Sequence, residues 1–198
     1  MSINDITIVI TSFKSDKIIN NCLNSIDKQY KVIIVENSAD FEFKKKIEEK
    51  FSNVECILAG KNLGYGKANN IGLGRVESKY ALILNPDTTL YSSAISNFFK
   101  VIKEIPDFAI IAPVIQDKQD EILNIKSESP ILVRNVKGFA MFLNLSEFDN
   151  VGFFDENFFF YFEEIDLCKR LIKKNKKIYW CPNILIYHMG GQSHDSSI

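Results

Sequence analysis

Three carboxylates stand at the start of a predicted helix, directly after a run of five aromatic residues. The run is Phe158-Phe-Phe-Tyr-Phe162, and Glu163, Glu164 and Asp166 follow it. Apolar surroundings disfavour the charged form of a carboxylate and raise its pKa, which is what a general base needs in order to work near neutral pH. The segment is therefore our first candidate for a site of acid–base chemistry.

Helical periodicity separates the three acids, since successive residues are about 100° apart around a helix. Four apolar residues define one face of the predicted helix: Ile165, Cys168, Leu171 and Ile172. Glu164 falls near the middle of that face, whereas Glu163 and Asp166 fall on the polar side with Arg170. The pattern predicts Glu164 as the inward-pointing base, with Glu163 as its rival. A structural interpretation stays open, in which the acids suit the helix dipole and Asp166 pairs with Arg170.

Asp87 is a candidate metal ligand because it follows a buried apolar run, at the end of Leu84-Asn-Pro-Asp87. A carboxylate at a strand end can bind a hard divalent cation that also holds phosphate oxygens. Asn-Pro-Asp is also a common turn sequence, and these residues alone favour the turn. His188, in Tyr187-His-Met-Gly-Gly-Gln-Ser193, ends another strand-like run and is either a ligand or a packed histidine.

A glycine-containing loop, Asn62-Leu-Gly64-Tyr-Gly66, precedes another predicted helix. It differs from the dinucleotide-binding fingerprint, because Asn69 stands where a third glycine is needed and the loop follows the third strand rather than the first. We interpret it, together with Asn70, as a loop that passes close to a nucleotide.

Short β-branched runs and amphipathic helical segments alternate in the first half of the chain. The predicted strands are 6–10, 32–35, 54–58, 80–84 and 108–112, and apolar residues recur at helical spacing in 18–26 and 43–51. This order predicts an α/β fold with a mostly parallel sheet and helices on both sides. Ligands of such sheets lie at the carboxyl ends of the strands, where Thr11, Glu36 and Asp87 occur.

The second half has a different rhythm beyond Pro113. A polar stretch over 116–130 leads to apolar residues at 136–143, the acidic helix, and two strand-like runs at 177–182 and 184–187. These elements are expected to complete the same sheet. No linker marks a boundary, so we expect one domain over residues 1–198.

The composition of the chain argues against nucleic-acid binding and against a membrane span. The formal net charge of −1 lacks the basic footprint of a nucleic-acid-binding protein. The first residues do not resemble a signal peptide and no apolar run is long enough for a membrane span, so we expect a cytoplasmic protein, with weak attraction to anionic lipid left open. The 4 cysteines form no Cys-x-x-Cys pair and are expected to be reduced and buried. Many of the 16 phenylalanines lie between 139 and 162, where they build either a core, which we favour, or an apolar rim around a cleft.

Taken together and in this order, the motifs resemble those of the family 2 glycosyltransferases, especially the rhamnosyltransferase-like branch that builds bacterial surface polysaccharides. The segments that carry the resemblance are 62–72, 84–87, 158–170 and 187–193. The resemblance implies a GT-A-like domain that moves a sugar, with inversion, from a UDP- or dTDP-linked donor to a hydroxyl of a saccharide or lipid-linked saccharide. Such an enzyme would act in the cytoplasm, with the inner face of the cell membrane left open.

The resemblance also implies roles for individual residues. Mn²⁺ or Mg²⁺ would be held by Asp87 and His188, and the base would be the second acid of the motif, Glu164, with Glu163 and Asp166 beside it. Contacts to the nucleotide-sugar would come from strand ends and the glycine loop: Thr11, Ser12, Glu36, Asn37, Asn62, Gly64, Asn70, Asn85 and Asp87. Glu36 and Glu164 depart from the family pattern, which has aspartate at both positions.

Two rival functions stay open. One is a nucleotide-sugar-binding subunit of a larger assembly, without catalysis. The other is a nucleotidyltransferase, which shares this kind of sheet but has a loop rich in Gly and Arg or Lys after the first strand, unlike Thr11-Ser-Phe-Lys14.

Overall fold

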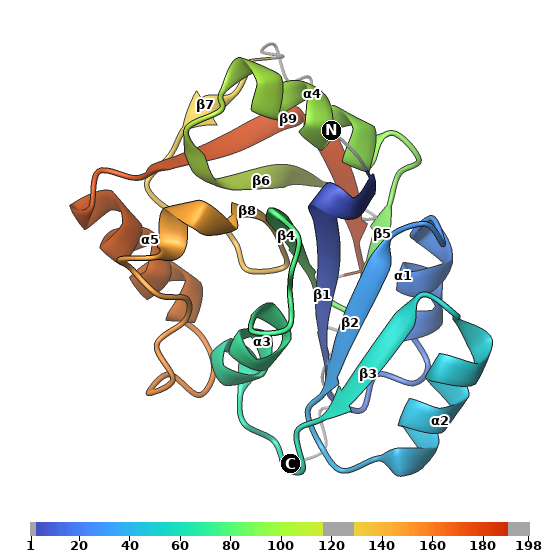
Figure 1. The fold of residues 1–198 in the computed structure, drawn as a ribbon. Coiled ribbons are helices and arrows are strands. Elements are labelled where there is room, and N and C mark those ends of the chain that lie inside the picture. Colours follow the sequence, from blue (N-terminus) through green and yellow to red (C-terminus); the bar gives the residue numbers. More distant parts are fainter. Residues whose placement is uncertain (1–2, 117–128, 190–198) are drawn as a thin grey trace.

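A mixed sheet forms the centre of the protein (Figure 1). The computed structural model describes residues 3–116 and 129–189. Within these ranges the strands are β1 (Ile6–Ser12), β2 (Lys31–Glu36), β3 (Val54–Leu58), β4 (Tyr80–Leu84), β5 (Thr88–Leu90), β6 (Phe108–Gln116), β7 (Ile131–Leu132), β8 (Ala140–Asn144) and β9 (Lys177–His188). The helices are α1 (Ile19–Ser25), α2 (Phe41–Lys50), α3 (Tyr65–Leu73), α4 (Ala94–Glu104) and α5 (Glu163–Lys173), with short 3-10 turns at Ile3–Asp5 and Leu145–Phe148. The predicted α/β class is confirmed.

The strand order places the carboxyl ends of the first four strands along one edge. The order is β3-β2-β1-β4-β8-β6-β9-β5, and β7 pairs with β9. β1 is parallel to β2 and β4, and β2 is parallel to β3. β8 runs antiparallel between β4 and β6, while β9 is parallel to β6 and antiparallel to β5. The sheet is therefore mixed, as predicted.

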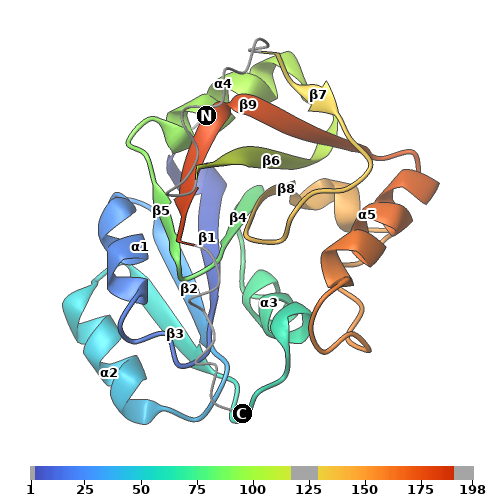
Figure 2. The same cartoon turned by 180° about the vertical axis from the view of Figure 1, so that it is seen from behind.

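Both faces of the sheet are covered, which explains why its central strands are apolar throughout. In β4, Leu82 and Leu84 belong to the core shared with α1, α2 and α4, while Ala81 and Ile83 belong to the core shared with α3 and α5. Figures 1 and 2 show α1 and α2 on one side of the sheet and α3 and α5 on the other. Burying one such side chain stabilises the fold by about 1.5–3 kcal/mol, so alternation with polar residues would be costly here.

One long strand, β9, replaces the two strands predicted at 177–182 and 184–187. Pro182 has no N–H to donate, and a proline inside a strand is tolerated at a bulge. The pairing with β6 has such an irregularity: Pro113 lies opposite Cys181, and the next residue, Val114, lies opposite Leu185. β6 likewise continues through Pro113 to Gln116, beyond the predicted end at 112.

The cysteines are reduced and buried, as expected. All four cysteines are free and buried, and burial raises the pKa of the Cys22 thiol to about 12, so none has the character of a reactive thiolate. Every helix in the described ranges is too short or too polar to cross a bilayer.

Candidate active site

The ends of β1 and β2 form a polar corner at the carboxyl edge of the sheet. Ser12 and Glu36 are direct partners in the parallel register, and both are buried, as is Thr11. Burial raises the pKa of Glu36, and a 2.5 Å hydrogen bond from the Ser38 hydroxyl opposes part of that rise. Among the residues that the structure describes, the Thr11 hydroxyl has no hydrogen-bond partner. The corner thus offers a hydroxyl and a carboxylate that a ligand could satisfy.

Asn37 and Asn62 fix the glycine loop through their side-chain amides. The Asn37 amide donates to Asn62 Oδ1 at 3.0 Å and to the Gly64 carbonyl at 3.2 Å, while Asn37 Oδ1 accepts from the Leu63 N–H at 2.9 Å. Asn62 Oδ1 also accepts from the Gly64 N–H at 3.0 Å. These two side chains therefore position the loop, and their contact with a nucleotide stays a prediction.

Gly64 is the point where the glycine loop touches the aromatic segment. Its φ of +83° is one that residues with a Cβ rarely adopt, and an added Cβ would lie only 2.1 Å from the Phe159 carbonyl oxygen. The next N–H, of Tyr65, donates to that same oxygen at 3.1 Å. The close approach explains why glycine stands here.

Asn70 holds the chain that leads into the aromatic segment. Its amide nitrogen donates to the Phe154 carbonyl at 2.9 Å, and its oxygen accepts from the Phe154 N–H at 3.0 Å. Both ends of the side chain are occupied within the protein. The structure gives Asn70 a positioning role, and the predicted nucleotide contact is untested.

Asp87 and His188 meet because a short strand pairs with the last one. Thr88, which starts β5, is the register partner of His188 in β9, and the Met189 N–H donates to the Asp87 carbonyl at 3.0 Å. His188 Nε2 lies 3.2 Å from Asp87 Oδ1. The turn before Asp87 is closed by a hydrogen bond from the Thr88 N–H to the Asn85 carbonyl at 3.2 Å. Residues 101 positions apart in the sequence thus form one pair of polar groups.

This pair has the chemistry of a metal site. Both carboxylate oxygens of Asp87, Nε2 of His188 and Oδ1 of Asn85 are buried, and none of these atoms has a hydrogen-bond partner within residues 3–116 and 129–189. Buried polar groups are normally satisfied, so their clustering here points to a missing ligand. Carboxylate oxygen and imidazole nitrogen suit Mn²⁺, and within the described ranges no larger group of acidic, His or Cys side chains converges. Asp87 and His188 could therefore hold a divalent cation.

Glu163 is the buried acid of α5, which contradicts its predicted place on the polar side of the helix. Its side chain is only 5% exposed, and burial raises the pKa of its carboxyl, with a smaller contribution from the charge of Glu164. Gly66 of α3 lies against it, since a Cβ added there would be in van der Waals contact with Glu163 Cβ at 3.6 Å. Ile172, which the helical face argument placed inside, is 39% exposed. The first turn is buried by α3 packing against it, which helical periodicity does not encode.

Glu164 is partly exposed and faces Tyr65 and Gly138. An added Cβ at Gly138 would lie 3.7 Å from the Tyr65 hydroxyl and 3.8 Å from Glu164 Cβ. Burial, followed by the negative charges of Glu163 and Glu164 and then of Asp87, raises the pKa of Tyr65. The phenol stays neutral and donates a hydrogen bond to the Gly138 carbonyl. Tyr65 and Glu164 therefore both border Gly138.

Tyr65 is a site residue that was not predicted. The sequence carries a signal for it, since an aromatic residue follows Gly64 in the glycine loop. What was missing is its partner, because nothing in the sequence links that loop to Gly138.

Asp166 lies apart from the two glutamates, in a structural network. It pairs with Arg170 at 2.6 Å, and the same guanidinium donates to the carbonyls of Val151 and Phe153. This confirms the pairing that was left open for these two residues. A catalytic role for Asp166 stays a prediction, and its contacts favour holding α5 against the loop before it.

The phenylalanines between 139 and 162 form both a core and a rim. Phe139, Phe142, Phe148 and Phe154 are buried, but the aromatic segment 159–162 is exposed, at 65% for Phe162. Tyr161 and Phe162 both have positive φ, of 68° and 71°, and such strain of about 1–3 kcal/mol per residue is typical of functional sites. The exposed aromatic segment ends directly before Glu163.

Comparison with known proteins places this site in a family. The family model described as "Glycosyl transferase family 2" matches residues 7–168. The low-salt glycan biosynthesis hexosyltransferase Agl10 of Haloferax volcanii is 26% identical, over 94% of this chain and 67% of the relative. The rhamnosyltransferase WbbL of Escherichia coli is also 26% identical, over 87% of this chain and 77% of the relative. An N-acetylglucosaminyl-diphospho-decaprenol L-rhamnosyltransferase of Mycobacterium tuberculosis is 20% identical over 82% and 67%.

Solved structures show the same fold. Residues 1–349 of S. aureus TarS, in complex with UDP-GlcNAc, superpose with a TM-score of 0.75 over 98% of this chain, at 16% identity. The mannosyltransferase PcManGT of Pyrobaculum calidifontis, in complex with GDP-Man and Mn²⁺, gives 0.76 over 95%, at 10% identity. This chain spans only 62% and 57% of those two chains, and the likeness is one of GT-A glycosyltransferase fold. Because the family model covers most of the chain, from the first strand into the helix of acids, the chain belongs to glycosyl transferase family 2 and is a glycosyltransferase.

Proposed function

We propose that this chain is an inverting, metal-dependent glycosyltransferase that moves a sugar from a nucleoside-diphosphate sugar to a hydroxyl of a saccharide or lipid-linked saccharide, in the synthesis of a bacterial surface polysaccharide. The observation that supports this most is the pair of Asp87 and His188, whose facing atoms are buried and have no hydrogen-bond partner within the described residues. We place the reaction in the cytoplasm, at the inner face of the membrane when the acceptor is lipid-linked.

In this proposal the donor lies along the carboxyl edge. Thr11, Ser12 and Glu36 face the nucleoside, since they provide hydroxyl and carboxylate groups at the ends of β1 and β2. Asp87 and His188 would hold Mn²⁺ or Mg²⁺, which when bound neutralises the negative charge that develops on the departing diphosphate. The base and sugar of the donor are left to experiment, because Glu36 departs from the aspartate of the family.

Glu164 is the proposed general base. A base must be reachable by the acceptor, and Glu164 is partly exposed whereas Glu163 is almost wholly buried. Glu164 takes the proton of the acceptor hydroxyl, the hydroxyl oxygen bonds to the anomeric carbon, and the bond from that carbon to the diphosphate oxygen breaks. One displacement from the opposite face inverts the anomeric configuration. Glu163 supports the site from behind as an acid with a raised pKa.

The acceptor is expected on the side of the exposed aromatic segment 159–162. These side chains stand directly before the glutamates and offer apolar faces to a ligand. Exposed apolar patches of this kind mark interaction sites more often than chance allows. Their position favours contact with the acceptor over contact with the nucleotide, which lies at the ends of β1 and β2.

A thermal-shift panel of nucleoside diphosphates, each with Mn²⁺ or with EDTA, tests the donor site. UDP or dTDP should raise the melting temperature when Mn²⁺ is present and not when EDTA is present, because a ligand that binds only the folded state stabilises it. Equal shifts in EDTA would exclude the metal-dependent site. Donor turnover, with the anomeric configuration of the product read by NMR, then separates an inverting transferase from a non-catalytic binding subunit.

A further inference from the structure

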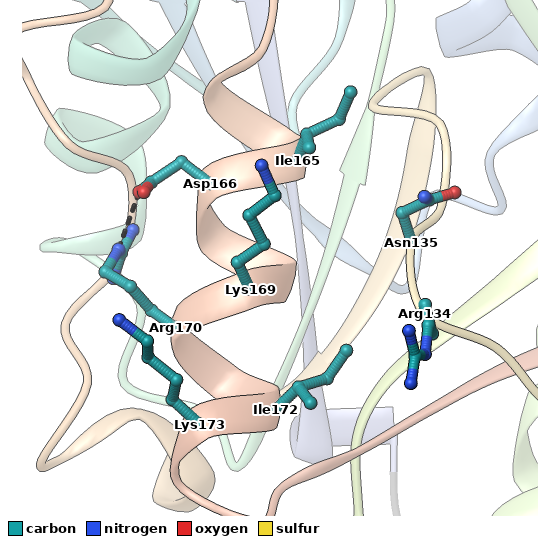
Figure 3. A pocket seen from close by; sticks show the side chains of 8 residues that line it. All are labelled: Arg134, Asn135, Ile165, Asp166, Lys169, Arg170, Ile172 and Lys173. Atoms are coloured by element: carbon teal, nitrogen blue, oxygen red, sulfur yellow. Dashed lines mark hydrogen bonds and ion pairs between the residues drawn. The ribbon is translucent and has the colours of Figure 1, made fainter.

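A groove with basic walls runs along the outer side of α5. It lies between this helix and the segment 133–135 and has a volume of about 530 Å³ (Figure 3). The predicted site residues Glu163 and Glu164 do not line it. Asp166 does, and so do residues from the first turn of the helix to its last.

Three cations of the groove are available to a ligand. The guanidinium of Arg170 is occupied by Asp166 and by the carbonyls before α5. Arg134, Lys169 and Lys173 are exposed, and within residues 3–116 and 129–189 none of them forms an ion pair. Since Arg170 neutralises Asp166, the groove is cationic in a chain whose formal net charge is −1. The positive charge is therefore concentrated in the groove and does not reflect the composition of the whole chain.

The floor of the groove between these cations is apolar. Figure 3 shows Ile165 and Ile172 on α5 directed toward the segment of Arg134, with Lys169 between them. Ile172 is 39% exposed, so its side chain is open to contact with a ligand. Cations beside an apolar floor suit an anionic group attached to an apolar chain better than they suit water or a free sugar.

The groove begins beside the candidate base. Ile165, which lines it, follows Glu164 directly. At about 1.5 Å of rise and about 100° of turn per residue, Lys169 and Lys173 lie about 7.5 and 13.5 Å along the helix axis from Glu164, and about 140° and 180° around it. An acceptor whose hydroxyl reaches Glu164 would therefore pass around the helix, over Ile165, to place its far end at these cations.

We propose that this groove binds the phosphate or diphosphate of a lipid-linked acceptor, with Lys169, Lys173 and Arg134 as its ligands. Lysine ammonium groups bind phosphate as point charges, and the arginine guanidinium can bind two of its oxygens at once. The saccharide of such an acceptor lies toward Glu164 and the lipid follows the isoleucines outward. The inference rests on the proposed function in taking Glu164 as the acceptor end of the site.

The first test is binding of inorganic diphosphate to the whole chain in EDTA, followed by amide chemical shifts. EDTA removes the metal on which the donor site depends. Shift changes are expected at residues 134–135 and 165–173. Changes confined to residues near Thr11, Glu36 and Asp87 would overturn the groove as an anion site while leaving the proposed function intact.

A double variant provides the matched comparison. Lys169→Gln with Lys173→Gln should weaken diphosphate binding in the groove by about tenfold or more, because hydrogen bonds to charged groups are among the stronger ones in proteins. The control is Lys45→Gln with Lys46→Gln, which makes the same charge change on α2, on the other side of the sheet (Figure 1). Equal affinity in the two double variants contradicts the proposal.

The second test distinguishes the acceptor's phosphate from the headgroup of a membrane lipid. With a transfer assay in hand, the groove variant should raise KM for a prenyl-diphosphate-linked saccharide about tenfold and leave KM for the same saccharide without phosphate unchanged. An unchanged KM for both, with lost sedimentation on phosphatidylglycerol vesicles but not phosphatidylcholine vesicles, would assign the groove to the membrane surface and overturn the acceptor site. Inactivity of every form toward both acceptors would instead count against the proposed function.

Discussion

Two adjacent glutamates at the start of α5 have different surroundings, and this difference suggests different work. Glu163 is enclosed by α3 and by the chain around Phe154, so its pKa is raised. Glu164 is partly exposed beside Tyr65 and Gly138. A proton acceptor has to be reached by its substrate, whereas an enclosed acid can only act through its neighbours. The two roles can be separated by replacing one carboxylate at a time.

Glu164→Gln should lower the transfer rate by the 10²–10⁴-fold, roughly, that is typical of losing a general base. Donor affinity should change little, because the group faces the acceptor. Single-turnover transfer and donor titration measure the two effects separately. Glu163→Gln is the matched control, and a reversal, with Glu163→Gln inactive and Glu164→Gln active, would assign the base to the buried acid.

Glu163→Gln should change how stability depends on pH. Burial raises the pKa of this carboxyl in the folded state, so its protonated form is favoured by folding. The stability of the native chain linked to this group is complete below the unfolded-state pKa and declines as the pH rises through the folded-state pKa. The glutamine cannot ionise, so the variant should gain in melting temperature relative to the native chain as the pH rises above the ordinary pKa of a glutamate. Glu49→Gln, on the exposed face of α2, is the control, and parallel curves for Glu163→Gln and the native chain would contradict this.

Asp87→Asn should abolish metal-dependent binding of a nucleoside diphosphate without unfolding the protein. The carboxylate lies 3.2 Å from His188 Nε2 and accepts no hydrogen bond within the described residues, so the isosteric amide should keep the fold. Titration calorimetry with UDP and Mn²⁺ measures the loss, and the melting temperature checks the fold. Metal-dependent affinity equal to that of the native chain would remove Asp87 from the site.

His188→Ala should give a partial loss of nucleoside-diphosphate affinity that is seen only in the presence of metal.

The glutamates also show where reasoning from the sequence was insufficient. The presence of an acid–base segment and the pairing of Asp166 with Arg170 could be read from residue types and spacing. The burial of Glu163 could not, because it depends on the packing of α3, whose Gly66 lies 97 positions away in the sequence. A helical wheel describes a helix's own faces and says nothing of what packs on its first turn.

At the scale of elements, the site depends on contacts that hold the acidic helix and its preceding segment. Asn70 in α3 fixes Phe154, Gly64 fixes Phe159, and Arg170 fixes the chain at Val151 and Phe153. These contacts lie behind the glutamates rather than between them and a substrate. They position the carboxylates by fixing the chain on either side.

Asn70→Ala should destabilise the fold by about 1–3 kcal/mol, since the backbone N–H and carbonyl of Phe154 both lose their partner. Transfer should fall more than donor binding does, because the segment before Glu163 is loosened while the corner of β1 and β2 is untouched. Urea unfolding and the two assays measure this. Asn97→Ala, which removes two exposed hydrogen bonds of α4, to the Asn183 carbonyl and from Lys100, is the control and should cost less. Equal losses of donor binding and transfer would argue against a positioning role.

Elements with strong local signals were predictable, and those defined by their partners were not. Strands β3 and β4 have the predicted bounds, because their apolar runs end at polar or turn residues. The three-residue strand β5 carries no periodicity of its own and exists through its pairing with β9. Pro113 and Pro182 were taken as ends of strands, and the sheet instead passes both of them at an irregularity in register.

At the scale of the whole molecule, the sheet gathers a site from nearly the full length of the described chain. Thr11 lies on the first strand, Glu36 on the second and His188 at the end of the last. The parallel pairing of β1 with β2 brings Thr11 and Glu36 to the same edge, as predicted. The meeting of Asp87 with His188 required the position of β9, which no local pattern reveals.

Ligand binding at such a site should therefore stabilise the fold as a unit. A nucleoside diphosphate at 100 times its Kd, with Mn²⁺, should add about 2.7 kcal/mol to the free energy of unfolding. For a domain of this size that corresponds to a rise of roughly 5–11 °C in melting temperature. Asp87→Asn should remove the rise. A transition that splits into two on adding ligand would show that the site belongs to only part of the fold.

The pairing of β5 with β9 brings Asp87 to His188, so the affinity for metal should depend on how often this edge of the sheet is paired. β5 ends the strand order and has only three residues, so the free energy needed to open it is expected to be small compared with that of global unfolding. Each opening separates Asp87 from His188, and the apparent Kd for metal then equals the intrinsic Kd divided by the closed fraction. A substitution that loosens this edge would weaken metal binding without touching either ligand, and bound metal would slow amide exchange along Thr88–Leu90.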